Sequence, residues 1–328
     1  MGVTPEDLVR SGRYLDMSDT DWEAELATRK YVLNCYEAND EWAVKIKKNV
    51  GVLLTSSCYG LPYLKASLES HKKLGYWTVL AYDNFVDPAN GEKDIDYNRW
   101  LPPKDVMVNV DTLLIPHHQT WGGVSYPFIF MLRLASGIFH SMDYVLVNNG
   151  DMVLEKPEGF QTLIDKMGDA DLMSSGPSLP REIGTAGIIM TSKAFMAVAK
   201  HMNDNMVPAS SYYASTQDFG NTEGRLAVAV RDLGLKQVIC RPGACPNHVL
   251  DEKHPGGCEQ LHVPGGEWYD TIGMRHIHGE LNYAYRYKQM PPPSKYLDER
   301  FTGNEDMKAA RAYETGDIEF VRNWWAKE

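Results

Sequence analysis

The 328-residue sequence contains no apolar run long enough to cross a membrane, since stretches such as Tyr144–Val147 fall far short of the roughly 20 residues that a spanning helix needs. Its first residues, MGVTPEDLVR, show no basic stretch followed by an apolar one, so a secretory signal is not expected. Cysteines are few, and their odd number of 5 favours reduced thiols. Together these features predict a cytoplasmic protein with no membrane span.

Positive charge is also scarce, because 33 Lys and Arg face 44 Asp and Glu and give a net charge of −11. Long-range repulsion opposes the approach of such a chain to nucleic acid or to an anionic membrane, so a general binder of either is not expected. Hydrophobic residues make up 43% of the sequence, which is enough for a packed core and excludes global disorder.

Apolar strand-like runs alternate with helical patterns from Val50 onward, beginning with a strand over 50–55, a helix over 61–74 and a strand over 76–82. Strand, helix and strand within about 35 residues form the βαβ unit of a parallel sheet. We therefore predict an α/β domain over 49–290, with a mainly parallel sheet and helices on both faces. Further predictions are a helical N-terminal extension (1–48), a helical C-terminal tail (291–328), a strand-like run at 106–110 and a loop-rich stretch at 241–275.

The most informative segment runs from Gly122 to Leu154, where a helix carrying Arg133 leads into an apolar strand that ends in Asn148-Asn149-Gly150-Asp151. This order resembles the GT-A glycosyltransferases, in which such a strand ends in an Asp-x-Asp motif. In that family the motif holds a divalent metal that bridges the diphosphate of a nucleotide-sugar donor. The resemblance covers about residues 50–287 by order of elements, and it implies a GT-A-like fold. Asn149 stands in place of the motif's first Asp.

The resemblance also implies the metal ligands. A hard cation such as Mn²⁺ or Mg²⁺ prefers oxygen ligands, which Asp151 would supply. Further on, Arg275-His276-Ile277-His278-Gly279 resembles the His-x-x-Gly segment of glycogenin-like members, whose His completes the metal shell. His276 has that spacing, and His278 is the alternative ligand.

The donor-binding residues follow from the same resemblance. The end of the first strand resembles the segment that contacts the base and ribose, and Asp83 resembles the carboxylate after the second strand. Arg133 corresponds to a basic residue facing the diphosphate, and residues 184–190 resemble the glycine-containing segment beneath the donor and acceptor sugars. The implied donor contacts are Thr55, Ser56, Ser57, Asp83, Arg133, Asn149 and Gly187.

Residues 215–225 resemble the acidic segment that opens the last catalytic helix of the family. In inverting members a carboxylate there accepts the proton of the acceptor hydroxyl, and a general base must lie within hydrogen-bond reach of that group. Asp218 is the first candidate and Glu223 the second. The His276 segment is typical of retaining members, so the stereochemical outcome stays open.

The sequence thus predicts a glycosyltransferase that moves a hexosyl or pentosyl group from a nucleotide sugar to a glycan, small-molecule or macromolecular acceptor. A catalytically inactive GT-A-like binding module and a sugar nucleotidyltransferase are the alternatives, although the latter needs a charged Gly-rich loop where residues 55–60 have no charge. Motifs for nicotinamide binding and for a P-loop are absent. A separate cluster could hold zinc or be a loop with buried thiols: Cys240, Cys245, His248, His254, Cys258 and His262.

Overall fold

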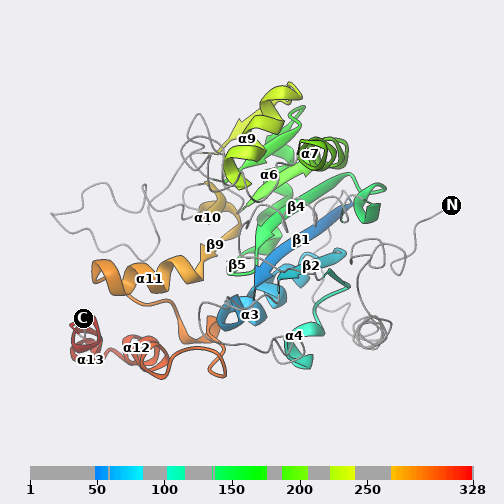
Figure 1. The fold of residues 1–328 in the computed structure, drawn as a ribbon. Coiled ribbons are helices and arrows are strands. Elements are labelled where there is room, and N and C mark those ends of the chain that lie inside the picture. Colours follow the sequence, from blue (N-terminus) through cyan, green and yellow to red (C-terminus); the bar gives the residue numbers. More distant parts are fainter. Residues whose placement is uncertain are drawn as a thin grey trace.

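The computed structural model describes residues 49–57, 60–83, 102–114, 135, 137–175, 187–205, 222–240 and 267–326. These residues form a seven-stranded sheet with the strand order β3-β2-β1-β4-β7-β6-β8. Figure 1 shows its strands β2, β1 and β4 side by side. Its strands are β1 (Val50–Ser57), β2 (Thr78–Asp83), β3 (Thr112–Leu114), β4 (Tyr144–Asn149), β6 (Leu172–Ser174), β7 (Ile188–Thr191) and β8 (Gln237–Ile239).

The sheet is mainly parallel, and only β7 runs against its neighbours. The pairs β1–β2, β1–β4, β2–β3 and β6–β8 are parallel, whereas β7 pairs antiparallel with both β4 and β6. The carboxyl ends of β1, β2 and β4 therefore meet at one edge, with Thr55 paired to Asn149 and Ser57 paired to Asp83. Ligands of open α/β sheets bind beyond such an edge.

Helices cover both faces of the sheet. The side chains of a strand alternate between its two faces, and apolar side chains of β4 are buried on each of them. Leu146 of β4 belongs to a buried cluster formed with α3 (Leu61–Lys72), α6 (Phe160–Met167) and α10 (Glu267–Ile272). Val145 and Val147 belong instead to a second buried cluster formed with α7 (Ser192–Asp204) and α9 (Thr222–Asp232). The predicted class, an α/β fold with a mainly parallel sheet between helices, is confirmed.

A smaller unit of the chain lies beside this sheet. β5 (Met152–Leu154) pairs antiparallel with β9 (Met274–His276), and α11 (Ile277–Tyr287) follows β9 directly. The chain continues through a 3-10 turn (Ser294–Tyr296), α12 (Asn304–Thr315) and α13 (Ile318–Trp325), whose apolar faces form a third buried cluster. Figure 1 shows these last helices gathered at one end of the molecule, in orange and red. In the described part of the chain, no helix has the length and apolarity to span a bilayer.

One local prediction was wrong. Residues 106–110 were expected to form a strand, but α4 (Lys104–Met107) is a helix there. Pro103 precedes it and Asp105 lies in its first turn, and both features favour a helix start over a strand. Of the stretch 241–275, which was expected to be loop-rich, only 267–275 lies within the described residues, and it forms α10 and most of β9. The predicted N-terminal extension lies outside the described residues.

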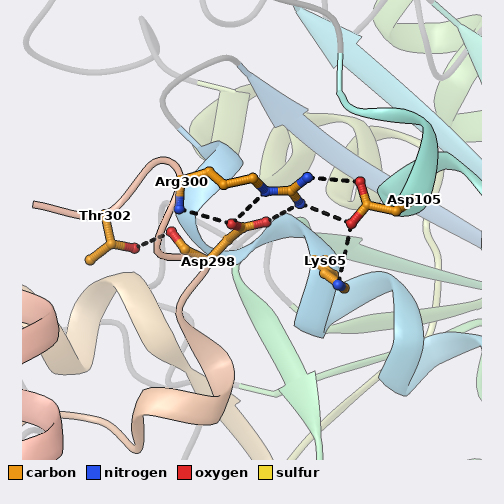
Figure 2. A network of polar contacts seen from close by, with 5 residues as sticks. All are labelled: Lys65, Asp105, Asp298, Arg300 and Thr302. Carbon is orange, nitrogen blue, oxygen red and sulfur yellow. Dashed lines mark hydrogen bonds and ion pairs between the residues drawn. The ribbon is translucent and has the colours of Figure 1, made fainter.

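A polar network fastens the segment before α12 onto α3 and α4 (Figure 2). The guanidinium of Arg300 donates to both carboxylate oxygens of Asp105, at 2.8 and 3.0 Å, and also to Asp298. Lys65 of α3 donates to Asp105 at 3.3 Å, and the Thr302 hydroxyl donates to the carbonyl of Asp298 at 2.8 Å. The hydrogen bonds from Arg300, and to a smaller extent that from Lys65, lower the pKa of Asp105 to about 2.

We expect this network to contribute little to stability. The side chains of Arg300 and Asp105 are 42% and 48% exposed, and water and salt screen such pairs. Arg300→Gln should lower the free energy of unfolding by about 1 kcal/mol at low ionic strength and by less in 1 M NaCl. Urea unfolding at both salt concentrations measures this, and a larger loss that salt does not reduce would contradict it.

Candidate active site at the carboxyl end of β4

The turn Asn149-Gly150-Asp151 is held tightly against the end of β1. The Gly150 amide donates to the Thr55 carbonyl at 2.7 Å, and the Thr55 hydroxyl donates to Asn149 Oδ1 at 3.1 Å. A Cβ atom at position 150 would lie 2.6 Å from Cβ of Ser56, so glycine is the residue that fits. β1 therefore fixes where the turn projects Asp151.

Asp151 meets a histidine that lies 125 positions further along the chain. Its Oδ2 is 3.0 Å from Nε2 of His276. The antiparallel register of β5 and β9 pairs Met152 with His276, and the Ile277 amide donates to the Asp151 carbonyl at 2.9 Å. The side chains of Asp151 and His276 are 18% and 17% exposed, so they are largely but not completely screened from solvent.

One buried atom of each side chain in this pair lacks a partner. Oδ1 of Asp151 and Nδ1 of His276 have no hydrogen bond within the described part of the protein. Burial raises the pKa of Asp151, but the neighbouring His276 outweighs it and the pKa lies below its usual value. Burial lowers the pKa of His276, and Asp151 outweighs that effect in turn and raises it. A buried carboxylate oxygen without a donor calls for an explanation, and a bound cation supplies one.

His278 is the less suitable of the two histidines. Its Nδ1 lies 3.1 Å from the hydroxyl of Tyr63, and its Nε2 lies 2.8 Å from the amide of Asn282. Both ring nitrogens are thus engaged, and the ring centroid is 6.3 Å from that of His276. Burial first, and then the His276 charge, lower the pKa of His278 although Asp151 opposes them. His276 faces Asp151 directly, whereas His278 is held by α3 and α11.

The structure gives a physical reason for the His-x-x-Gly spacing. His276 ends β9 and precedes α11, whose first turn brings Gly279 beneath the imidazole. A Cβ atom at position 279 would lie 2.7 Å from Nδ1 of His276. Any side chain there would displace the ring from the position in which its Nε2 meets Asp151.

Gly279→Ala should therefore weaken Mn²⁺ binding about tenfold, the equivalent of about 1.4 kcal/mol, while the far-ultraviolet circular dichroism stays unchanged. Titration of the two proteins with Mn²⁺, followed by electron paramagnetic resonance, measures the difference. Gly316→Ala is no control, because Gly316 has a positive φ of 79°. Gly303→Ala is suitable, since a Cβ atom there would meet only the Asp306 carboxylate, at 3.2 Å. Equal Mn²⁺ affinity in Gly279→Ala and wild type would contradict the packing argument.

A buried ion-pair cluster that sequence reasoning missed lies on the other side of β9. Arg275 donates to both carboxylate oxygens of Glu280, at 2.9 and 2.5 Å, and to Glu155 at 3.0 Å. The Tyr296 hydroxyl also donates to Glu155. The Arg275 and Glu280 side chains are 7% and 0% exposed. Successive residues of a strand point to opposite faces, so this cluster anchors β9 with His276 directed toward Asp151.

The other predicted site residues are distributed as follows. Thr55 and Ser56 lie beside the turn, and Gly187 begins the segment that leads into β7. Only the backbones of Ser57 and Asp83 are described, and they are paired at the same sheet edge. Glu223 lies in α9 with its side chain outside the described residues. Arg133 and Asp218 lie outside them altogether.

Of the Cys/His cluster that could hold zinc or be a loop with buried thiols, only Cys240 is described. It is buried, and the Trp268 indole donates to its sulfur at 3.0 Å. Burial raises the pKa of this thiol to about 11, so it is protonated at neutral pH. Its five predicted companions fall outside the described residues, and within the described ranges no three His, Cys, Asp or Glu residues cluster as metal ligands.

No family model and no curated protein sequence matches the chain. Among solved structures, a mannosyltransferase from Pyrobaculum calidifontis in complex with GDP-Man and Mn²⁺ matches with 11% identity and a TM-score of 0.37, over 73% of this chain and 67% of its own. A protein assigned as a nucleotide-diphospho-sugar transferase from Desulfovibrio desulfuricans G20 matches with 11% identity and a TM-score of 0.40, over 84% of this chain and 97% of its own. Structures of nucleotide-sugar transferases are thus among those that the fold resembles, but similarity this low assigns no function.

Proposed function

We propose that the protein is a nucleotide-sugar-dependent glycosyltransferase in which Asp151 and His276 hold a divalent cation. The observation that carries the proposal is the Asp151–His276 pair, with Oδ2 and Nε2 3.0 Å apart and with Oδ1 buried and without a hydrogen bond from any described residue. The pair lies just beyond the carboxyl end of β4, where open α/β sheets bind ligands.

The two side chains fit a divalent cation such as Mn²⁺ or Mg²⁺. A carboxylate is a hard oxygen ligand, and an imidazole adds a nitrogen ligand that Mg²⁺ favours less than the transition metals do. Mn²⁺ is therefore the cation that we propose first. The remaining coordination positions would be available to the oxygens of a donor diphosphate. The ion, when bound, would offset the negative charge that develops on the leaving nucleoside diphosphate.

The rest of the donor would lie along the same sheet edge. Thr55 and Asn149 hold each other at 3.1 Å beside the turn, and the backbones of Ser57 and Asp83 continue the edge toward β2. We propose that these residues, with Ser56 and Gly187, contact the nucleotide and sugar. Arg133 remains the proposed partner of the diphosphate, and Asp218 or Glu223 the proposed base that accepts the acceptor's proton.

One observation favours a second candidate, a binding module without turnover. Residue 149 is an asparagine, so Asp151 is the single carboxylate of the turn. Oδ1 of Asn149 already accepts a hydrogen bond from Thr55. A site with one carboxylate has less negative charge to bind the cation than an Asp-x-Asp motif has. Such a module would bind a nucleotide sugar with Mn²⁺ but would not release the nucleoside diphosphate.

A melting panel tests the proposed function and the type of donor together. UDP-, GDP-, dTDP- and CMP-sugars are added with Mn²⁺ or with EDTA, and the melting temperature is recorded. A donor at 100 times its dissociation constant stabilises the native state by about 2.7 kcal/mol. We expect one nucleotide class to raise the melting temperature, and to do so with Mn²⁺ only. No shift with any donor would contradict the proposal, and a shift without release of nucleoside diphosphate would favour the binding module.

A further inference from the structure

Asn148, the penultimate residue of β4, is a polar side chain in an apolar position. It is completely buried, and it follows Tyr144 and Leu146 on the strand face that packs under α3. A buried amide costs free energy unless its hydrogen bonds are made. A side chain of this kind at the end of the central strand therefore needs its own explanation.

The amide of Asn148 uses all of its hydrogen-bonding capacity. Its Nδ2 donates to Nε2 of His71 at 3.0 Å and contacts the sulfur of Met274 at 3.5 Å. Its Oδ1 accepts from the backbone amides of Asn149, at 3.0 Å, and of Gly187, at 3.1 Å. An asparagine offers two N–H donors and one oxygen with two lone pairs. Because two backbone N–H groups face one end of the amide, that end must be the oxygen.

His71 of α3 fixes the other end of the Asn148 amide. The imidazole is completely buried, and its Nδ1 lies 2.8 Å from the Ser67 carbonyl. A carbonyl can only accept, so Nδ1 carries the hydrogen and Nε2 is left to accept from Asn148. This neutral tautomer holds the Nδ2 end of the amide and thereby keeps Oδ1 turned toward the two backbone amides.

Gly187, which receives this contact, has a backbone that few other residues could adopt. Its φ is +74°, and an added Cβ atom would lie 2.5 Å from Cε of Met274 and 2.8 Å from Cβ of Ser175. Its carbonyl accepts from the Ser175 amide at 2.9 Å. The peptide groups of Gly187 are therefore held on one side by Asn148 and on the other by Ser175.

We propose that Asn148, oriented by His71, is a positioning residue that sets the backbone of Gly187 relative to the Asn149–Asp151 turn. One amide oxygen holds the N–H groups of both segments, so their separation cannot change without breaking a buried hydrogen bond. The inference rests on the proposed function only in taking this edge as the donor site. Asn148 and His71 would act on the donor only through the backbone of Gly187 and the turn, without touching substrate themselves.

Two variants of Asn148 separate the role of its oxygen from that of its bulk. Asn148→Asp keeps an acceptor for both backbone amides but loses the donor to His71. Asn148→Leu keeps a side chain branched at Cγ, with a somewhat larger volume, and loses every hydrogen bond. We expect Asn148→Leu to speed the hydrogen exchange of the Gly187 amide and to weaken the Mn²⁺-dependent binding of UDP or GDP, each about tenfold, since both amides lose a buried acceptor. Asn148→Asp should stay near wild type in both, although its melting temperature falls.

The readouts are the Gly187 amide exchange by nuclear magnetic resonance and calorimetric titration with UDP and GDP in the presence of Mn²⁺. His71→Leu should change the Gly187 exchange and the nucleotide binding in the same direction as Asn148→Leu, but by less. His140→Leu is the matched control, because the exposed His140 also bonds a backbone carbonyl, that of Gly137, at 2.8 Å.

If Asn148 had a merely structural role, the changes in Gly187 exchange and in nucleotide binding would follow the loss in melting temperature across all variants. Wild-type Gly187 exchange in Asn148→Leu, or equal losses in Asn148→Asp and Asn148→Leu, would overturn the inference. If the wild-type protein binds neither nucleotide and no donor of the melting panel, the proposed function fails, while the exchange rates still decide whether Asn148 positions Gly187.

Discussion

Replacing Asp151 with alanine should lower the rate of glycosyl transfer about a hundredfold or more, the equivalent of about 3 kcal/mol in the activation free energy. The carboxylate lies 3.0 Å from His276, and its second oxygen is buried with no hydrogen bond from the part of the chain that the structure describes. Without it, the proposed cation would lose its oxygen ligand from the protein, and the charge on the departing diphosphate would be left uncompensated. Steady-state rates with saturating donor and Mn²⁺ measure the loss.

Two comparisons sharpen this test. His276→Gln should lose most of the rate, whereas His278→Gln should lose much less, because both nitrogens of His278 are bound to Tyr63 and Asn282. Asp165→Asn serves as the control, since Asp165 is an exposed residue of α6 that accepts from Gln161. A wild-type rate in Asp151→Ala, or full wild-type activity in EDTA, would show that the enzyme does not use the proposed cation.

Acid should destabilise the fold through His71. Burial lowers the pKa of this imidazole from the ordinary 6.5 to about 4, although the Ser67 carbonyl opposes the shift. Between those values the unfolded chain binds a proton that the folded protein does not, so stability is full above pH 6.5 and falls as the pH drops toward 4. The loss over this window should reach about 3 kcal/mol.

Urea unfolding at pH 7, 5.5 and 4 measures this loss as a difference between wild type and His71→Gln. The variant should be less stable at pH 7 because a glutamine amide does not reproduce the geometry of the imidazole's two contacts, with the Ser67 carbonyl and with Asn148, but its stability should fall less steeply with acid. His140→Gln should follow the wild-type curve in parallel. Parallel curves for wild type and His71→Gln would mean that His71 does not exclude its proton in the folded protein.

Much of the fold could be predicted from short apolar runs. Residues 50–55 and 144–147 lie within the buried, parallel-paired strands β1 and β4. The leucines that follow the first of these runs recur at near-helical spacing, and they lie in and just after α3. The strand predicted over residues 106–110 was wrong because a short apolar run is compatible with either a strand or a buried helix. Pro103, which directly precedes α4, favours the start of a helix. Periodicity alone does not carry that information.

The candidate site was predictable only in part. The turn after β4 identified Asp151, but the choice between His276 and His278 depends on where β9 ends and α11 begins. The bonds of Asn148 to His71 and Gly187 span 77 and 39 positions. No local pattern encodes such pairs, because the sheet brings them together.

Anomalous diffraction from crystals of the protein with Mn²⁺ and UDP or GDP, whichever class stabilises it, tests most directly whether Asp151 and His276 bind a cation together with a nucleoside diphosphate. We expect one manganese peak in contact with the Asp151 carboxylate, the His276 imidazole and the diphosphate. A peak away from this pair, or a nucleotide bound elsewhere than beyond the carboxyl end of β4, would contradict it.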